Sequence, residues 1–281
     1  MAPQVTDPKG RPTVPFDRIE PGQEVGSISY VLDDKVVGRH LRATGQDPYP
    51  GPYAPVSILA AEGVNLADRF YDISQSVHAG QQLEVHAVPR LGSTLTVSGR
   101  AVDKFVKRGR RYVQIATTTH DDAGVHIASG LTTGVVVYGE AEGAGAPKGD
   151  DHPADVNVIE TVGPLERVMT KEAMVLYEPE GDRNIHTDDD FARAVGLPSA
   201  IATGTLFLAY VFDLLYRRYG FAAVPGTQLD VRIRKPVFAG DVIVTTGVVV
   251  ERDNGRDHLR VECVGPWGAV VSGTAVVRSG A

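Results

Sequence analysis

Apolar and polar positions alternate along several stretches of the chain, mostly towards the end of each half. In these stretches β-branched residues alternate with polar ones, which is typical of half-buried antiparallel strands. The pattern predicts strands at 94–101, 112–120, 126–137, 242–250, 258–264 and 269–278. Between two of them, Asp253, Asn254 and Gly255 predict a type I′ hairpin turn.

A helical stretch precedes the strands in each half. In the second half, residues 199–220 are apolar on almost every face, and Gly220 ends the stretch. A helix that is apolar all round must be enclosed by other elements. In the first half, residues 55–73 form a more amphipathic counterpart. One helix followed by a long antiparallel sheet, twice over, predicts an α+β fold in which each sheet curls around its helix.

The two halves also resemble each other in sequence. LEVHAVPRLGSTLTVSGRAV (83–102) resembles LDVRIRKPVFAGDVIVTTGVVV (229–250) in its proline, glycines and alternating residues. The offset of about 145 residues is a normal domain size. Residues 139–157 are rich in Gly, Ala, Pro and Asp without periodicity, which is typical of a linker. We therefore expect two domains, 1–138 and 158–281.

Composition and charge narrow the class of protein. The net charge of −7 gives no electrostatic reason to expect nucleic acid or an anionic membrane as partner. The single cysteine, Cys263, rules out an internal disulfide and a cysteine-based zinc site, and it suits a reducing compartment. The N-terminus lacks the apolar segment of a secretory signal, and residues 200–216 are too short and polar to span a membrane. We therefore expect a cytoplasmic protein.

The stretch GDRNIHTDDDF (181–191) carries the candidate chemistry. Its Asp and Asn side chains are ordinary turn formers, and Thr187 or Asp188 can cap a helix whose first turn holds Asp189 and Asp190. An imidazole and a carboxylate that share a water molecule could instead transfer protons near neutral pH. These residues alone leave both interpretations open, although the three consecutive acids are better explained as capping.

Further along, the same region resembles a known family. GDRNIHTDDDFARAVGLPSAIATG (181–204) resembles the signature of MaoC-like (R)-specific enoyl-CoA hydratases and dehydratases, in which G-D-x-N-P-[LIV]-H precedes an I-x-H-G helix start. KPVFAGDVIVTTGVV (235–249) resembles that family's R-P-V-x-P-G-D segment at the start of a strand. The resemblance implies a hotdog fold in its double form, with the first half as a diverged copy. Two departures stand out: the proline before Ile185 is missing, and Thr203 replaces the histidine before Gly204.

The resemblance implies a hydratase or dehydratase that acts on a 2-enoyl or 3-hydroxyacyl thioester of coenzyme A or a carrier protein. In that case Asp182 and His186 hold the catalytic water, and Asn184 orients the loop or the aspartate. The backbone N–H of Gly204, at the positive end of the long helix, stabilises the enolate oxygen. No metal or other cofactor is required, and a homodimer is expected.

Other residues are expected to shape the binding site. The first half reads RATGQDPYPGPYAPVSILAAEG (42–63) at the equivalent place, with an aspartate but no following histidine, so we expect one active site per chain. Its tyrosines, Tyr49 and Tyr53, are expected to shape a substrate tunnel. Thr203 and Arg234 are further candidate substrate contacts, and Arg234 could meet the phosphates of coenzyme A. Histidines on the strand patterns, at 86, 120, 126 and 258, are expected to lack nearby partners.

Three alternatives remain open at this point. A hotdog thioesterase would direct a carboxylate and water at the thioester carbonyl and release free thiol, and Glu62 on the first-half helix is its candidate carboxylate. The shortened loop also allows a specialised substrate that is not a thioester. A non-catalytic binding protein would need neither Asp182 nor His186.

Overall fold

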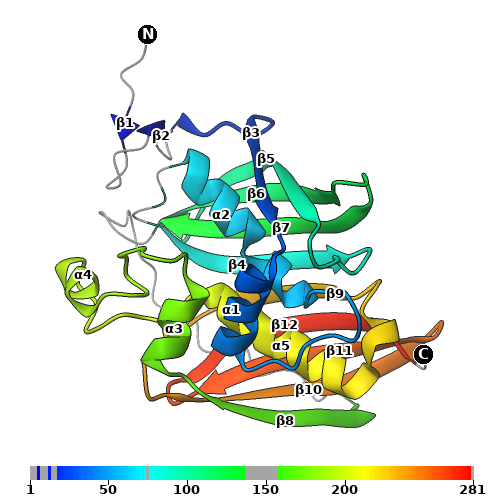
Figure 1. Cartoon of the computed structure of the whole chain (residues 1–281). Helices are drawn as coiled ribbons and strands as arrows, with labels where there is room; N and C mark the ends of the chain where they lie inside the picture. Colours follow the sequence, from blue (N-terminus) through cyan, green and yellow to red (C-terminus); the bar gives the residue numbers. More distant parts are fainter. Residues whose placement is uncertain are drawn as a thin grey trace.

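A ten-stranded antiparallel sheet runs through both halves of the chain (Figure 1). The strand order across it is β3-β5-β6-β7-β4-β9-β12-β11-β10-β8 in the computed structural model. The first half contributes β3 (Glu24–Val31), β4 (Ser76–Val85), β5 (Thr94–Lys107), β6 (Arg110–Asp121) and β7 (His126–Val136). The second half contributes β8 (Glu160–Val168), β9 (Gln228–Ile233), β10 (Val242–Asp253), β11 (Arg256–Gly265) and β12 (Gly268–Arg278).

The halves join where β4 pairs with β9 at the centre of the sheet. Outwards from this seam the strand order is the same on both sides, so each strand of one half has a counterpart in the other. The pairing runs from Gly80 opposite Arg232 to Glu84 opposite Gln228. This arrangement is the double hotdog that the sequence predicted. The expected two curled sheets are continuous with each other through the seam.

Helix α5 (Gly204–Tyr219) is the central helix of the second half and lies against β8, β10, β11 and β12 (Figure 1). Every residue from Thr205 to Leu215 is buried, as the apolar pattern predicted. The one acid among them, Asp213, is paired with Arg167 at 2.7 Å and with Arg217 at 3.0 Å. These partners compensate the cost of burying its charge.

The corresponding stretch of the first half is divided. It forms a 3-10 helix, η2 (Val56–Ala61), followed by α2 (Glu62–Phe70), where the sequence predicted one helix over 55–73. Gly63 lies directly against β7, because a Cβ added there would stand 1.9 Å from Oγ1 of Thr132. Only a residue without a side chain permits so close an approach of helix to sheet.

Shorter elements complete each half. Helix α1 (Asp34–Thr44) of the first half packs against α3 (Lys171–Tyr177) of the second. Helix α4 (Asp189–Ala194) and the 3-10 helix η3 (Phe221–Ala223) flank α5 in sequence. At the predicted hairpin, Asn254 and Gly255 have φ values of 48° and 70°, as a type I′ turn requires.

Three of the strand histidines lie together, contrary to expectation. The ring centroids of His86 and His126 are 4.1 Å apart, and those of His120 and His126 are 4.9 Å apart. The Ser129 hydroxyl lies within hydrogen-bond distance of His86 at 3.0 Å and of His126 at 3.1 Å. The strand pattern could not reveal this cluster, because register between β4, β6 and β7 decides which side chains become neighbours.

The structure describes residues 18–71, 73, 76–136 and 157–279, and the backbone of the short strands β1 (Val5–Thr6) and β2 (Pro12–Thr13). Of the predicted linker, only residue 157 falls within these ranges. Among the described residues, no helix has both the length and the apolar character needed to cross a membrane.

Candidate functional site

Two adjoining cavities lie where the loop before α5 meets the first half. The inner cavity has a volume of about 390 Å³ and is lined mainly by apolar side chains of both halves, including Val77, Ile115, Ile201, Phe207 and Ile233. The outer pocket has a volume of about 500 Å³ and a more polar wall. Val64, His186 and Thr203 line both spaces, so they mark the junction. Both volumes are in the range of small-molecule sites.

His186 stands at this junction with one ring nitrogen committed. Its Nδ1 lies 2.9 Å from the carbonyl oxygen of Ile201, which can only accept a hydrogen bond. In the neutral ring Nδ1 therefore carries the proton, and Nε2 keeps a lone pair. The backbone N–H of Ile201 donates in turn to the Ile185 carbonyl at 3.0 Å. This bond holds the loop that carries His186 (residues 178–188, the histidine loop) against the segment before α5. His186 is thus oriented as a base.

Asn184 orients the histidine loop. Its Oδ1 accepts from the backbone N–H groups of His186 at 2.8 Å and Thr187 at 3.2 Å. Its Nδ2 donates to Oε2 of Glu178 at 3.0 Å. The orienting role expected for Asn184 therefore has a direct structural counterpart, and the carboxylate it contacts is that of Glu178.

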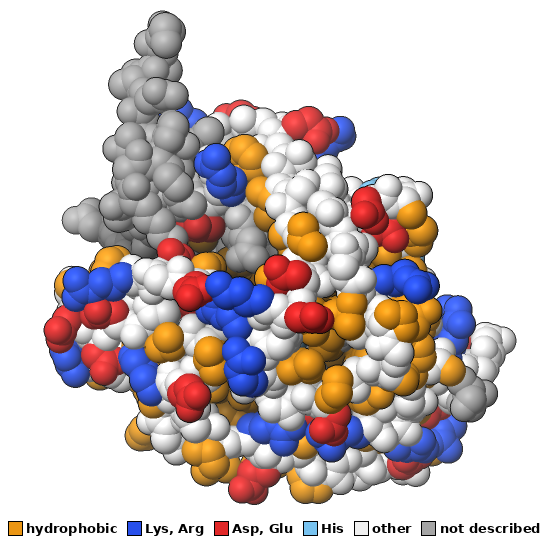
Figure 2. Space-filling model, in the orientation of Figure 1, with side chains coloured by type: hydrophobic (Ala, Val, Ile, Leu, Met, Phe, Trp, Pro, Cys, Tyr) orange, Lys and Arg blue, Asp and Glu red, His pale blue; other side chains and the backbone are white. Residues whose placement is uncertain are grey.

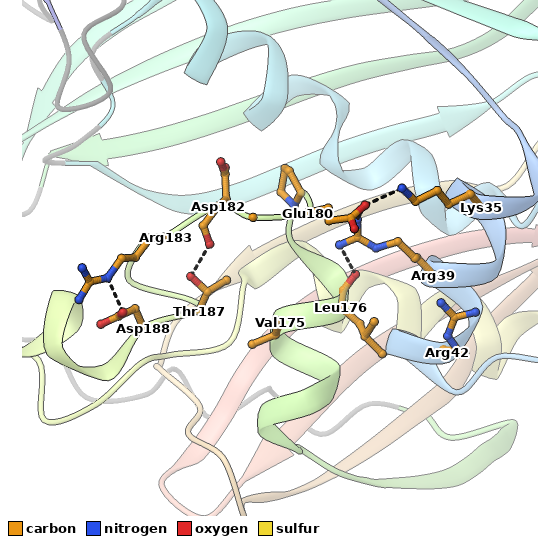
Figure 3. A pocket seen from close by; sticks show the side chains of 12 residues that line it. Lys35, Arg39, Arg42, Val175, Leu176, Glu180, Asp182, Arg183, Thr187 and Asp188 are labelled. Carbon is orange, nitrogen blue, oxygen red and sulfur yellow. Dashed lines mark hydrogen bonds and ion pairs between the residues drawn. The ribbon is translucent and has the colours of Figure 1, made fainter.

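Asp182 lines a side pocket that adjoins the outer one. The side pocket has a volume of about 530 Å³, and Lys35, Arg39 and Arg183 also line it (Figure 3). Asp182 lines neither of the spaces that His186 lines. Its carbonyl oxygen accepts the Thr187 hydroxyl at 2.8 Å, on the side opposite to its carboxylate (Figure 3). The structure therefore does not bring Asp182 and His186 together on one cavity wall.

Glu178 was missed in the sequence, although its carboxylate lies next to the predicted site. It lines the outer pocket with His186 and Thr203. Its Oε1 accepts the hydroxyl of Thr203, and its Oε2 accepts the amide of Asn184. The side chain of Arg39 in α1 holds the backbone here by donating to the carbonyl of Glu178. No motif pointed to this residue, because it precedes the recognisable G-D-x-N segment.

The start of α5 opens onto the inner cavity. Thr203 is the N-cap residue, and its hydroxyl is directed to Glu178 and makes no capping bond within the helix. The first N–H groups of a helix have no partner within it, and they carry the positive end of the helix dipole. A Cβ added to Gly204 would meet the tip of Ile233 at 2.8 Å, so glycine keeps this wall of the cavity open. The geometry suits the oxyanion role expected for Gly204.

His78 of β4 is a second residue that sequence analysis missed. It lines the inner cavity, and a Cβ on Gly204 would stand 3.6 Å from its Nδ1. Nε2 lies 2.9 Å from the Gly80 carbonyl, whereas Nδ1 is buried without a hydrogen-bond partner among the described residues. Burial lowers the pKa of His78 to about 4, so the ring is neutral at neutral pH. The first half thus contributes a neutral imidazole to the wall of the cavity.

The remaining predicted contacts fall in different places. Arg234 lines the inner cavity and donates to the Ser272 hydroxyl at 2.8 Å. Tyr49 is buried and stacks on Tyr216, with ring centroids 4.5 Å apart. Tyr53 lies beside Phe221, with ring centroids 5.1 Å apart. The two tyrosines line neither space at the junction, so the structure does not bring them to His186.

The acidic run after His186 caps a helix, as expected. Asp188 is the N-cap of α4, and its Oδ1 accepts from the Phe191 N–H at 2.8 Å. Asp189 and Asp190 occupy the first turn, where a negative charge is favourable. Asp188 is also paired with Arg183. The cap fixes the end of the loop that carries His186.

A basic face of α1 borders the outer and side pockets. Lys35 and Arg39 line both pockets, and Arg42 lines the side pocket. Their spacing places them on one side of the helix. Lysine and arginine side chains lie among acidic ones over α1 and α3 (Figure 2), and Lys35 is paired with Glu180 at 2.5 Å. Within the described ranges, no group of three His, Cys, Asp or Glu side chains could hold a metal ion.

Comparison with known proteins places this site in a family context. Residues 157–264 match the model of the MaoC like domain. The structure is similar to a MaoC-like dehydratase from Phytophthora capsici (TM-score 0.71, 17% identity, covering 95% of this chain and 98% of that one). It is also similar to a double-hotdog protein from Mycobacterium tuberculosis (TM-score 0.66, 13% identity, 95% and 98% covered).

A third similar structure is described as an oleoyl thioesterase from Lactobacillus plantarum (TM-score 0.57, 11% identity, 92% and 97% covered). At these identities the structures establish the fold alone. No match was found among curated protein sequences.

Proposed function

We propose that this chain, a MaoC-like protein with the double-hotdog fold, is a hydro-lyase that adds or removes water across the 2,3 double bond of an acyl thioester. The observation that carries the proposal is the position of His186. His186 lines both the apolar cavity and the polar outer pocket, beside the open start of α5, and its Nδ1 contact leaves Nε2 as the nitrogen with the lone pair. Hydration of an enoyl thioester needs a base, a donor for the enolate oxygen and a dry acyl site, and these features supply all three.

The reaction uses two groups of the site, the imidazole of His186 and the backbone N–H of Gly204. Nε2 of His186 takes a proton from water, and the water oxygen bonds to C3 while the double-bond electrons move towards the thioester carbonyl. The N–H of Gly204, reinforced by the α5 dipole, stabilises the oxygen where negative charge develops. The proton then passes from the imidazolium to C2. Dehydration is the same path in reverse.

The two spaces suit the two parts of a thioester. The acyl chain fits the inner cavity, since apolar side chains from both halves line it. The carrier fits the outer pocket, where Lys35 and Arg39 can meet the phosphates of coenzyme A despite the net negative charge of the protein. We therefore propose an acyl-CoA substrate that threads past Val64, His186 and Thr203.

A thioesterase is the second candidate, because the structure described as an oleoyl thioesterase is similar to this one. Its candidate carboxylate, Glu62, accepts hydrogen bonds from Tyr30 at 2.7 Å and Thr119 at 2.5 Å and lies buried against the sheet. It lines neither the inner cavity nor the outer pocket. A carboxylate in that position cannot direct water at a thioester, so we favour the hydro-lyase.

Mass spectrometry on a panel of 2-enoyl-CoA thioesters tests this proposal. The wild-type protein, His186→Ala and the control His258→Ala, on the second-half sheet, are compared with each substrate. Water gain that is lost only in His186→Ala supports the hydro-lyase. Release of free coenzyme A without water gain would instead identify the thioesterase. Binding without any reaction would leave a non-catalytic binding protein.

A further inference from the structure

Three carboxylates precede His186 closely in sequence, those of Glu178, Glu180 and Asp182. Asp182 lines the side pocket (Figure 3), whereas Glu178 and Glu180 line the outer pocket with His186. Of these two, Glu180 is exposed and paired with Lys35 at 2.5 Å. A carboxylate that shares a water molecule with His186 must reach the same cavity as its imidazole. By this criterion Glu178 is in the right place, and Asp182 is not.

The local fold explains why Asp182 is turned away. The N–H of Asp182 donates to the Pro179 carbonyl at 3.2 Å, and its own carbonyl accepts the Thr187 hydroxyl at 2.8 Å. The N–H of Asn184 donates to the same hydroxyl at 3.0 Å. The loop is therefore closed on itself around Thr187. Only three residues separate Asp182 from His186, so the chain is short for presenting both side chains on one side.

Glu178 is bound to both segments that form the site. Through Oε2 it holds Asn184, whose Oδ1 in turn holds the backbone of His186 at 2.8 Å. Through Oε1 it holds Thr203 at the start of α5. A carboxylate has about four lone-pair positions, and these two bonds occupy two of them. Glu178 therefore keeps acceptor capacity for a water molecule in the outer pocket.

We propose that Glu178, and not Asp182, is the carboxylate that works with His186. This assignment rests on the hydro-lyase function proposed above. Glu178 accepts a hydrogen bond from one hydrogen of the catalytic water and orients its oxygen towards C3. His186 takes the other proton from the water and delivers it to C2. One O–H bond and the π bond between C2 and C3 break, one C–O and one C–H bond form, and no further reagent is needed.

Steady-state kinetics test the assignment, with an enoyl-CoA that the wild-type protein converts as substrate. The variants are Glu178→Gln, Asp182→Asn and His186→Ala. Glu178→Gln keeps the shape of the side chain but loses the charge. We expect kcat to fall by about 10²-fold with KM changed less than threefold, because the charged hydrogen-bond acceptor that orients the water is lost. Asp182→Asn should stay within about threefold of wild type, and His186→Ala should lose at least as much as Glu178→Gln.

Chemical rescue separates this role from a purely structural one. Glu178→Ala opens space at the carboxylate position. Added formate should raise the kcat of this variant at least tenfold, whereas the kcat of Asp182→Ala should not change with formate. Urea unfolding of each variant shows whether it is folded. A Glu178→Ala protein that is folded, inactive and not rescued would contradict the assignment.

The failure of this assignment differs from the failure of the proposed function. If Asp182→Asn loses 10²-fold or more and Glu178→Gln stays within threefold, the carboxylate is Asp182 and the hydro-lyase function stands. If both carboxylate variants are active and only His186→Ala fails, Glu178 has no part in the chemistry. If His186→Ala is fully active, both the proposed function and this assignment are wrong.

Discussion

The two halves of the chain repeat one plan of strands and helices, yet their central helices begin differently. In the second half, Thr203 and Gly204 open α5 onto a cavity, and His186 faces the same space. In the first half, Glu62 and Gly63 open α2 against the sheet, with Gly63 pressed onto Thr132. Gly204 borders a cavity, whereas Gly63 borders a strand. Both halves thus have a glycine at the start of the central helix. What differs is the surroundings of that glycine, a cavity in the second half and a strand in the first.

The acidic residues of the halves differ in the same way. Asp47 in the first half forms an ion pair with Arg217 at 2.9 Å, and Glu62 is buried behind two hydroxyl groups. Glu178 in the second half lies at the wall of the outer pocket. Both of these first-half carboxylates therefore make structural contacts, Asp47 with α5 of the second half and Glu62 within the first half. Four changes test this difference between the halves.

Removing the imidazole should give the largest effect. His186→Ala should lower kcat/KM by about 10³-fold, because the general base is lost while the fold is kept. The matched change His120→Ala, on an exposed strand position of the first half, should leave kcat/KM within twofold. Kinetics on the same enoyl-CoA measures both. Equal losses in the two variants would contradict a site confined to the second half.

Glu62 should make stability depend on pH. Burial raises its pKa from 4.5 to about 7, so the folded protein holds this proton more tightly than the unfolded chain. Its contribution is fully present below pH 4.5 and is lost as pH rises through about 7, by up to about 3 kcal/mol. Glu62→Gln removes this dependence.

Urea unfolding at pH 4.5, 6 and 8 measures that loss. The unfolding free energy of Glu62→Gln should therefore rise relative to wild type over this range. Parallel pH curves for the two proteins would show that the buried carboxylate of the first half is not titrating as described.

Adding a methyl group to each helix-start glycine should separate stability from activity. Gly63→Ala forces a Cβ onto Thr132 and should lower the unfolding free energy by about 2 kcal/mol. Gly204→Ala meets side-chain atoms of Ile233, its Cδ1 at 2.8 Å and its Cγ2 at 3.3 Å, and should cost about 1 kcal/mol, less than Gly63→Ala. It should nevertheless reduce kcat/KM by about 10²-fold, since the substrate approach is crowded.

Thermal unfolding and kinetics on both glycine variants measure this pattern. A Gly204→Ala protein with normal activity would remove Gly204 from the site.

The smallest effects concern helix caps. Asp33 caps α1 in the first half by accepting from Val36 N–H at 2.8 Å, and Asp188 caps α4 in the second. Replacing either by alanine should cost about 1 kcal/mol of stability. Only Asp188→Ala should also lower kcat, because its cap ends the loop that carries His186. Equal kinetics for both variants would mean that the loop keeps its shape without the cap.

Much of this architecture follows from local patterns in the sequence. Alternating residues predicted the strands, the all-round apolar stretch predicted the buried α5, and Asn254 with Gly255 predicted the turn. His186, Asn184 and Gly204 could be named because they belong to one motif whose residues lie close along the chain. Periodicity and motif spacing report exactly such short-range relations between residues, such as which side of a strand or loop a side chain occupies.

The remaining features depend on contacts between distant segments. His78 reaches Gly204 only because β4 pairs with β9, and Arg39 reaches the Glu178 carbonyl only because α1 packs on α3. The direction of the Asp182 side chain depends on hydrogen bonds that close a loop around Thr187. A one-residue change in loop length redirects a side chain, and no local propensity records it.

The continuous seam between β4 and β9 has a consequence for how such a protein can change. In an assembly of two identical hotdog chains, every substitution occurs twice, so a change that improves one wall of a cavity also alters the opposite wall. Here the two units are encoded separately within one chain. A histidine can be kept in one unit while its counterpart is lost. His78 of the first unit can line the cavity beside α5 of the second unit although the second unit carries no equivalent histidine there. Joining two copies thus permits a division of labour that symmetry would forbid.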